Sequence, residues 1–326
     1  MLSVLDYRLS AIVTENLRQP SQEQKPEGNT PAENGKTSSS NSAAASRSVI
    51  HLATTGLPAS KELIRNTVHQ VKTFVFAGHD TTSTLLQWLF YEFSIHPSKL
   101  AKLRAEHESV FGPGAHSAGP ALSGTDGSAD RILGAMLPYT TAAVKEALRL
   151  HPPAGTTRHV PDESAGGRPV IIDFDRNDTT VNARELNGAT ATTDPKNSTT
   201  SSSTTTTAPP PTFPFKVNGL RIYPCHWLIQ RNPKIWGPDA TTFNPDRWLD
   251  DTYMSSIPVG AYRPFERGPR NCIGQDLAML EAKVALAMVA RAFEFALPAG
   301  AAEPYSIHAI IHKPSDEMRM TVGFAS

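Results

Sequence analysis

The stretch Phe265-Glu266-Arg267-Gly268-Pro269-Arg270-Asn271-Cys272-Ile273-Gly274 decides how this chain is to be interpreted. It places one cysteine directly before a helical pattern, because apolar residues follow at Leu277, Leu280, Val284 and Met288. That spacing predicts a helix with one buried face. The positive end of a helix dipole and nearby arginines favour the thiolate form of a cysteine, and a thiolate is a soft, electron-rich metal ligand.

The other residues of this stretch suit a flat ligand. Gly268 and Gly274 allow the backbone to turn tightly and to pass close to something flat, and Arg270 offers a planar fork suited to a carboxylate. The alternative is a buried free cysteine in a loop, which is how a lone cysteine usually behaves. Cys272 shares the chain with only Cys225, which we interpret as a packing residue. Two cysteines exclude a disulfide framework and a zinc cluster of cysteines.

Length and charge exclude several classes of function. The chain has 326 residues, enough for one large domain or two small ones. It carries 31 basic and 31 acidic residues, so electrostatics indicates no nucleic-acid partner and no membrane-surface partner. No stretch reaches the roughly 18 apolar residues that a membrane span needs, and the N-terminus shows no signal peptide.

The first part of the chain predicts a short helix, a disordered segment and then a long helix. Apolar residues between 3 and 18 fit a short helix, whereas residues 20 to 48 are too polar to offset their ordering entropy and are expected to be disordered. Ser60 is a plausible N-cap for a helix whose 3–4 apolar spacing continues for about thirty residues and ends at His96-Pro97.

The middle of this long helix breaks its own pattern. Ala77-Gly78-His79-Asp80-Thr81-Thr82 places polar residues and a glycine where the apolar face should continue. One interpretation is that threonine bonds back to the preceding turn and merely bends the helix. The other is a site where the helix opens locally and aims polar groups at a ligand.

The remainder predicts more helices, short strands and one insertion. Helices are expected at 97–110 and 137–150, with a loop at 112–130 between them. Residues 162–212 are expected to be a low-complexity surface insertion in a β-hairpin region, of which residues 187–211 are largely Thr, Ser, Ala and Pro. Asn218-Gly219 predicts a hairpin turn, and residues 293–295 and 318–322 alternate like short strands.

Four motifs together resemble one known family. Phe-x-x-Gly-x-Arg-x-Cys-x-Gly resembles the haem-binding signature of the haem-thiolate monooxygenases, the cytochrome P450 family. Ala-Gly-x-Asp-Thr-Thr resembles the oxygen-activating groove of the same family. Glu146-x-x-Arg149 and the segment from Phe243 to Trp248 are similar to two further motifs, in the family's order. The motifs are most similar to those of eukaryotic, fungal members of secondary metabolism.

The resemblance implies a role for each matching residue. Cys272 would be the axial iron ligand of haem b, with Phe265, Arg270 and Gly274 beside the cofactor. Arg158 would reach a haem propionate, and Gly78 would leave room above the iron. Thr81 would hydrogen-bond dioxygen or its water while Asp80 helps to relay protons; His79 is not expected to be an iron ligand. Glu146 and Arg149 would form a buried pair that also bonds Arg247, and these three residues would have a structural role.

The resemblance also implies the fold and its limits. It implies a mainly α fold with small β-sheets, an α+β architecture, of which this chain carries the C-terminal part. Residues 58–161 and 213–326 would form the haem-thiolate domain, preceded by residues 1–57 as a short helix plus a disordered segment. The family's N-terminal half is not matched, so we expect a chain that lacks it.

The function implied is insertion of one oxygen atom of O2 into an apolar organic substrate. Electrons would come from an NADPH-dependent reductase on the cytoplasmic side of the endoplasmic reticulum, although this chain shows no anchor. Two alternatives stay open. One is a related haem-thiolate isomerase or dehydratase, which has less need of Asp80 and Thr81. The other is a truncated, catalytically impaired haem-binding remnant.

Overall fold

We describe the chain from a computed structural model. It describes residues 8–15, 50, 54, 57–58, 60–123, 128–166, 168, 170–175, 182–185 and 212–325. The chain divides into two compact units, Met1–Asp80 and Thr81–Ser326. The segment expected to be disordered, residues 20–48, lies outside the described residues. Within the described part of the chain, none of the helices combines the length and apolar character that crossing a membrane requires.

The first unit contains a short helix and the beginning of the long one. Residues 8–15 are helical, inside the predicted range of 3–18. Leu9 and Val13 of this helix pack with Val68, which lies on α4 (Lys61–Ile95). The backbone N–H of Leu63 donates to the Ser60 hydroxyl at 3.0 Å, so Ser60 caps α4 as predicted.

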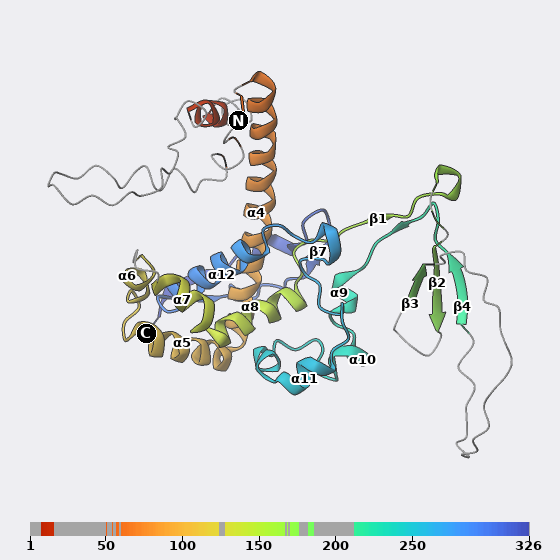
Figure 1. Cartoon of the computed structure of the whole chain (residues 1–326). Helices are drawn as coiled ribbons and strands as arrows, with labels where there is room; N and C mark the ends of the chain where they lie inside the picture. The colour runs from red at the N-terminus through yellow and green to blue at the C-terminus, as the bar shows by residue number, and fades with distance from the viewer. Residues whose placement is uncertain are drawn as a thin grey trace, which may run out of the picture. The chain divides into compact units, whose positions relative to one another are not determined.

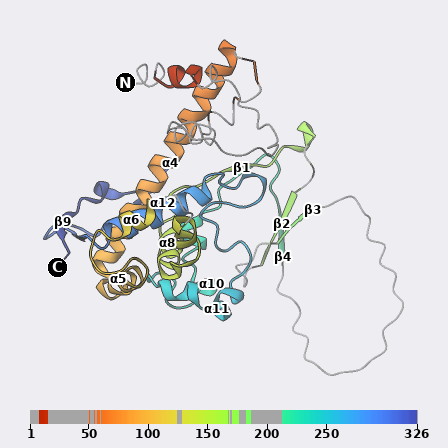
Figure 2. The ribbon, with the colours of Figure 1, turned by 60° about the vertical axis from the view of Figure 1, so that its left-hand side comes forward.

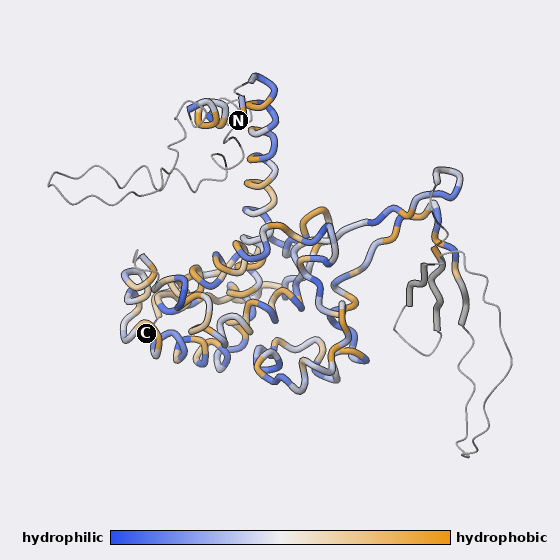
Figure 3. The backbone as a smooth tube through the Cα atoms, viewed as in Figure 1, coloured by the Kyte–Doolittle hydropathy of each residue, from blue (hydrophilic) through white to orange (hydrophobic). Residues whose placement is uncertain are grey.

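The second unit is built on helices that pack around α8 (Pro138–Leu150). Its largest core cluster joins the part of α4 after Asp80 with α5 (Pro97–Phe111), α8 and α12 (Gln275–Val289). Figures 1 and 2 show α5 and α12 close to α8 in both views. Figure 3 shows hydrophobic and hydrophilic residues alternating along these helices, as expected where one face is buried. Fully buried side chains at the centre of this cluster include Leu89, Leu103, Leu148 and Leu286.

Short helices complete the second unit. They are α6 (Ala118–Leu122), α7 (Ser128–Ala135), α9 (His226–Ile229), α10 (Pro233–Trp236) and α11 (Asp251–Ser256). Single turns of 3-10 helix occur at Glu163–Ala165 (η1), Pro245–Leu249 (η2), Gly268–Arg270 (η3) and Ser315–Met318 (η4).

All the described sheets are small and antiparallel. β1 (Arg158–His159) pairs with β5 (Arg221–Ile222), and β6 (Phe293–Ala296) pairs with β9 (Thr321–Phe324). β7 (Ser306–Ile307) pairs with β8 (Lys313–Pro314), and β2 (Val170–Asp175) lies between β3 (Asn182–Glu185) and β4 (Thr212–Lys216). The mainly α fold with small sheets is therefore the one predicted.

Several local predictions were wrong. The expected loop at 112–130 contains α6 and the start of α7. The helix does not open at Ala77–Thr82, because α4 is helical throughout. A turn does occur at Asn218-Gly219, but the strands that flank it, β4 and β5, pair with β2 and β1 rather than with each other. By contrast, the antiparallel strands β2 and β3 agree with the β-hairpin region expected within residues 162–212.

The predicted buried face of α12 was wrong at three of its four residues, since only Val284 packs against a core cluster. Leu277, Leu280 and Met288 are exposed, by 59%, 40% and 40%. The buried residues of this helix are instead Ala282, Leu286 and Ala287. Small alanines let a helix approach its neighbours closely, and periodicity locates an apolar stripe without showing what covers it.

Candidate functional site

Cys272 lies in a tight loop between η3 and α12, with its side chain exposed. Its backbone N–H donates to the Phe265 carbonyl at 2.8 Å, which closes the loop on itself. Gly268 adopts a φ of 79°, a left-handed conformation that glycine accommodates without steric cost. Phe265 packs against the main core cluster. The loop therefore presents the Cys272 thiol outward from a backbone fixed at both ends.

The surroundings of Cys272 fit a flat, apolar group that a thiolate ligates. Ile273 is 88% exposed and Leu277 is 59% exposed, so apolar surface flanks the sulfur. A Cβ added to Gly274 would lie 3.9 Å from the Cys272 Sγ, so glycine keeps the space beside the sulfur open. Arg270 is exposed next to the loop and is able to bind a carboxylate.

Within the described ranges, no three His, Cys, Asp or Glu side chains converge as metal ligands.

Glu146 is fully buried and lies at the centre of a hydrogen-bond network. Its carboxylate accepts from Arg149 Nε and Nη2 at 2.8 Å each and from Arg247 Nε at 3.0 Å. The Trp248 indole N–H and the Asn244 backbone N–H, both at 2.9 Å, complete its hydrogen bonds. The structure brings Glu146, Arg149 and Arg247 together from α8 and η2.

Arg149 extends this network into the segment after α9. Its Nη1 donates to the carbonyls of Gln230 and Ala240, each at 2.6 Å, and its Nη2 to that of Thr242 at 3.2 Å. Buried backbone carbonyls need partners, and a guanidinium supplies several donors in a fixed plane. Arg149 therefore fixes the path of residues 230–242, which lead towards Arg247.

The polar stretch of α4 carries three of the predicted site residues. Gly78 has open space where a Cβ would stand. The carboxylate of Asp80 lies 3.2 Å from Nδ1 of the exposed His79, a contact that the sequence analysis did not foresee. Thr81 is half-buried, and the hydroxyl of Thr82 is buried without a hydrogen-bond partner.

Arg158 lies on β1, in the sheet formed with β5. Its guanidinium donates to the Thr156 hydroxyl and, at 3.4 Å, to the Thr157 carbonyl. These local contacts leave most of the guanidinium donors available for another group.

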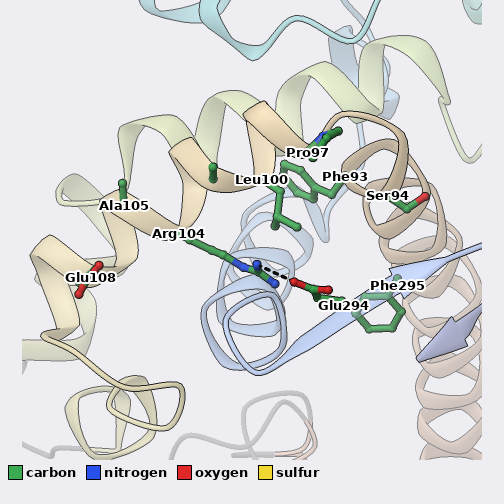
Figure 4. Close-up of a pocket in the computed structure, with 10 residues that line it drawn as sticks. Phe93, Ser94, Pro97, Leu100, Arg104, Ala105, Glu108, Glu294 and Phe295 are labelled. Atoms are coloured by element: carbon green, nitrogen blue, oxygen red, sulfur yellow. Dashed lines mark hydrogen bonds and ion pairs between the residues drawn. The ribbon is translucent and has the colours of Figure 1, made fainter. Parts of the chain in front are cut away.

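A groove of about 410 Å³ lies elsewhere in the second unit (Figure 4). It is lined by residues at the end of α4, along α5 and on β6, among them Phe93, Leu100 and Phe295. Arg104 and Glu294 form an ion pair across it at 3.3 Å. None of the predicted site residues lines this groove.

Sequence reasoning missed two residues beside the loop, Glu266 and His226. Glu266 has a left-handed backbone, with φ of 60°, and its carboxylate lies 3.1 Å from Nε2 of the buried His226. The buried position of Glu266 within the quoted stretch is not visible in the sequence. A histidine 40 positions away gives no sequence signal of the pairing either.

Comparisons with known proteins agree on one family. The family model for cytochrome P450 matches residues 44–165 and 217–321. Cytochrome P450 monooxygenase acrF of Aspergillus aculeatus is 34% identical over 244 residues, covering 70% of this chain and 40% of that protein. Cytochrome P450 4A10 of Rattus norvegicus is 32% identical over 225 residues, covering 69% of this chain and 33% of that protein.

A solved structure shares the fold. The crystal structure of a cytochrome P450 (CYP102L1) matches with a TM-score of 0.63 and 20% identity, over 99% of this chain and 56% of that one. This chain thus spans about two fifths or less of the length of the curated relatives named above. The family model covers most of the chain in two segments that contain all four motifs. The chain belongs to the cytochrome P450 family.

Proposed function

We propose that this chain is a haem-thiolate monooxygenase that inserts one atom of O2 into an apolar organic substrate. The other oxygen atom leaves as water, after two electrons from an NADPH-dependent reductase and two protons have been taken up. The observation that supports this most directly is the exposed Cys272 thiol, held in a closed loop with apolar surface beside it. Cytochrome P450 monooxygenases of Aspergillus species are among the similar proteins.

The proposal gives Cys272 the role of axial ligand to haem b. When bound, the haem supplies dioxygen activation, and a thiolate ligand pushes electron density toward the iron, which favours cleavage of the O–O bond. The protein's own contribution is ligation, orientation and control of water. Phe265 and Gly274 would shape the cofactor's surroundings, Arg158 and Arg270 would bind its propionates, and Gly78 would leave space for substrate and oxygen.

Asp80 and Thr81 are proposed to move protons. The Asp80 carboxylate is able to exchange protons with solvent. The hydroxyl of Thr81, the next residue, is able to donate a hydrogen bond. His79, 77% exposed and in contact with Asp80, offers a path between that carboxylate and bulk water. Glu146, Arg149 and Arg247 serve structure rather than chemistry.

The proposal extends to organisation and location. Residues 58–161 and 213–326 would form the haem-thiolate domain, with residues 162–212 as an insertion and residues 1–57 preceding it. By resemblance to the family, the proposed location is the cytoplasmic side of the endoplasmic reticulum, where the reductase would supply electrons.

A carbon monoxide difference spectrum tests the ligand. We expect the reduced, haem-loaded protein to show a strongly red-shifted Soret band, because thiolate ligation produces that shift. Cys272→Ala should lose the band, whereas Cys225→Ala, the matched control at the chain's other cysteine, should keep it. A red-shifted band that persists in Cys272→Ala, or its absence from the parent protein, would refute the proposal.

Thr81→Ala tests the proton role. We expect this variant to keep the red-shifted band but to form roughly a hundredfold less product per NADPH consumed, the lower end of what proton transfer contributes. The measurement compares NADPH oxidation, peroxide release and product from an apolar probe substrate. Thr73→Ala, an exposed threonine of the same helix, is the control. Equal coupling in Thr81→Ala and the parent would remove Thr81 from the mechanism.

A further inference from the structure

Glu266 combines a left-handed backbone with a carboxylate that is largely shielded from solvent, within the loop that carries Cys272. It follows Phe265, whose carbonyl accepts the Cys272 N–H. Its φ of 60° lies in the left-handed region, which few residues other than glycine adopt. Its side chain is only 11% exposed. A residue keeps an unfavourable backbone conformation and a buried charge only where its surroundings fix both.

The surroundings of Glu266 consist of three donors. Oε1 lies 3.1 Å from His226 Nε2, and Oε2 accepts from Arg263 Nη2 at 2.6 Å and from the Arg267 N–H at 3.2 Å. Burial alone would raise the pKa of Glu266, but the hydrogen bond and charge of Arg263 lower it overall. The carboxylate is therefore held ionised inside the base of the cysteine loop.

His226 connects Glu266 to a different segment of the chain. Its side chain is 1% exposed, and its Nδ1 lies 3.3 Å from the Ala154 carbonyl, in the segment that follows α8. Both ring nitrogens thus face acceptors, Ala154 on one side and Glu266 on the other. The imidazole thus contacts both segments, and in either neutral tautomer it donates to one of these two acceptors.

A second route joins the same loop to α8. The Arg263 N–H donates to the Gln230 Oε1 at 2.8 Å, and Gln230 Nε2 donates to the carbonyls of Leu148 and Arg149 at 3.2 and 2.9 Å. Arg149 belongs to the buried network around Glu146. The cysteine loop is therefore anchored to the segment after α8 through His226 and to the end of α8 through Arg263 and Gln230, and Glu266 contacts both His226 and Arg263.

We propose that Glu266 and His226 are positioning residues that hold the Cys272 loop in the conformation required for thiolate ligation. The inference rests on the proposed function, because it assigns a role relative to a haem bound by Cys272. Neither residue touches the sulfur in the described contacts; each acts through the peptide that joins Phe265 to Glu266. Loss of the anchors leaves the left-handed backbone of Glu266 unsupported, so the loop relaxes and ligation by the thiolate is lost more easily.

The test follows the red-shifted band over time in the haem-loaded protein at a raised, fixed temperature. We expect the band to decay about tenfold faster in Glu266→Ala and in His226→Ala, since a hydrogen bond to a buried charge is removed. The double variant should decay more slowly than the product of the two single effects would give, because the His226–Glu266 contact is lost in both single variants. Glu294→Ala, which removes an exposed carboxylate paired with Arg104, is the control and should match the parent.

Global unfolding is measured on the same samples by circular dichroism. A merely structural role would make band loss and unfolding accelerate together, whereas the proposal predicts that the band decays well before helicity is lost. If Glu266→Ala fails to fold, Glu266→Gln takes its place, because it keeps the size of the side chain and one acceptor oxygen. Its band should decay faster than that of the parent but less than tenfold faster.

The outcomes separate the two proposals. A parent protein without the red-shifted band refutes the proposed function and the present inference with it. If the parent shows the band, the positioning role alone is refuted by either of two results. The band of the Glu266 variants decays at the parent's rate, or it decays only as helicity is lost.

Discussion

Glu146 concentrates five hydrogen bonds on one carboxylate that is fully buried. A buried ion pair adds little when it is compared with an apolar replacement, but removing one partner leaves uncompensated charge in the interior. The network therefore specifies the geometry of residues 230–248 more than it adds to stability. Because these residues lead into the cysteine loop, the arrangement of that loop depends on a carboxylate about 120 positions earlier.

Glu146→Gln should lower the free energy of unfolding by about 3–5 kcal/mol, because Arg149 and Arg247 lose the charge that compensates them. Urea unfolding followed by circular dichroism measures the loss. Glu163→Gln, in which the removed carboxylate pairs with the exposed Lys216, is the control and should change stability little. A similar midpoint for both variants would contradict this account of the network.

Gly155 is required for a close approach rather than for an unusual φ. A Cβ at this position would lie 2.5 Å from the Tyr223 hydroxyl and 3.0 Å from His312 Nε2, where these two side chains meet at 3.2 Å. Gly155→Ala should therefore destabilise the protein by about 1–3 kcal/mol through overpacking. Gly134→Ala, in α7 with open space around the added methyl, should instead be neutral or stabilising. Thermal unfolding distinguishes the pair, and an unchanged midpoint in Gly155→Ala would show that Tyr223 moves aside freely.

At the scale of elements, α8 illustrates a helix that depends on a neighbour for its N-terminus. Its N-cap residue, Leu137, offers no side-chain acceptor. Glu106 of α5 accepts from the backbone N–H groups of Tyr139 and Thr140 at 2.6 and 2.9 Å, and from the Thr140 hydroxyl at 2.6 Å. A carboxylate at this end also interacts favourably with the helix dipole. Tertiary contact thus supplies the cap that local sequence lacks.

Glu106→Ala should cost about 1–2 kcal/mol of stability, as expected for the loss of a helix cap. Glu108→Ala, two residues further along α5 and exposed, is the matched control. Denaturant midpoints of the two variants give the comparison. If Glu108→Ala proved as destabilising as Glu106→Ala, the effect would belong to α5 rather than to the start of α8.

The long helix α4 keeps its structure through residues that local rules disfavour. Gly78, Asp80 and Thr81 are poor interior helix residues, yet the helix is continuous from Lys61 to Ile95. Phe74, Val75 and Phe76, one turn earlier, are exposed by 44%, 56% and 54%. The apolar pattern predicted the helix correctly, but it did not show which of its turns would be covered.

At the scale of the whole molecule, acid stability depends on Glu92, near the end of α4. Its carboxylate lies 2.7 Å from Nε2 of His151, just after α8, and 3.3 Å from Nδ1 of His96. His151 also stacks on Trp88, with ring centroids 3.8 Å apart. Burial would raise the pKa of Glu92, but the hydrogen bonds from His151 and His96 outweigh it and lower the pKa to about 2.

A carboxyl group with a lowered pKa in the folded state stabilises the protein above its unfolded pKa and loses that contribution as pH falls. Here the loss should occur as pH falls from 4.5, the ordinary pKa of a glutamate carboxyl, to about 2. Glu92→Gln should reduce stability at pH 7 by about 2 kcal/mol and flatten the dependence on pH across this window. Unfolding measured from pH 7 to pH 2 tests this, with Glu281→Gln on the exposed side of α12 as control. Parallel pH profiles for the parent and Glu92→Gln would contradict it.

The sequence by itself determined the family and the fold class. The spacing around Cys272 predicted a thiolate ligand before a helix, the mainly α class was correct, and the two ends of the chain's longest helix were located by Ser60 and Pro97. These features depend on residues close together in the chain, where propensity, capping and motif spacing act directly.

Only the tertiary structure decided which faces are covered and which charges are compensated. It exposed Leu277 and Leu280, buried Ala282 and Leu286, and paired Glu266 with His226 across 40 positions. Burial and long-range pairing are properties of the surfaces that meet in space, and a local pattern does not contain its distant partner.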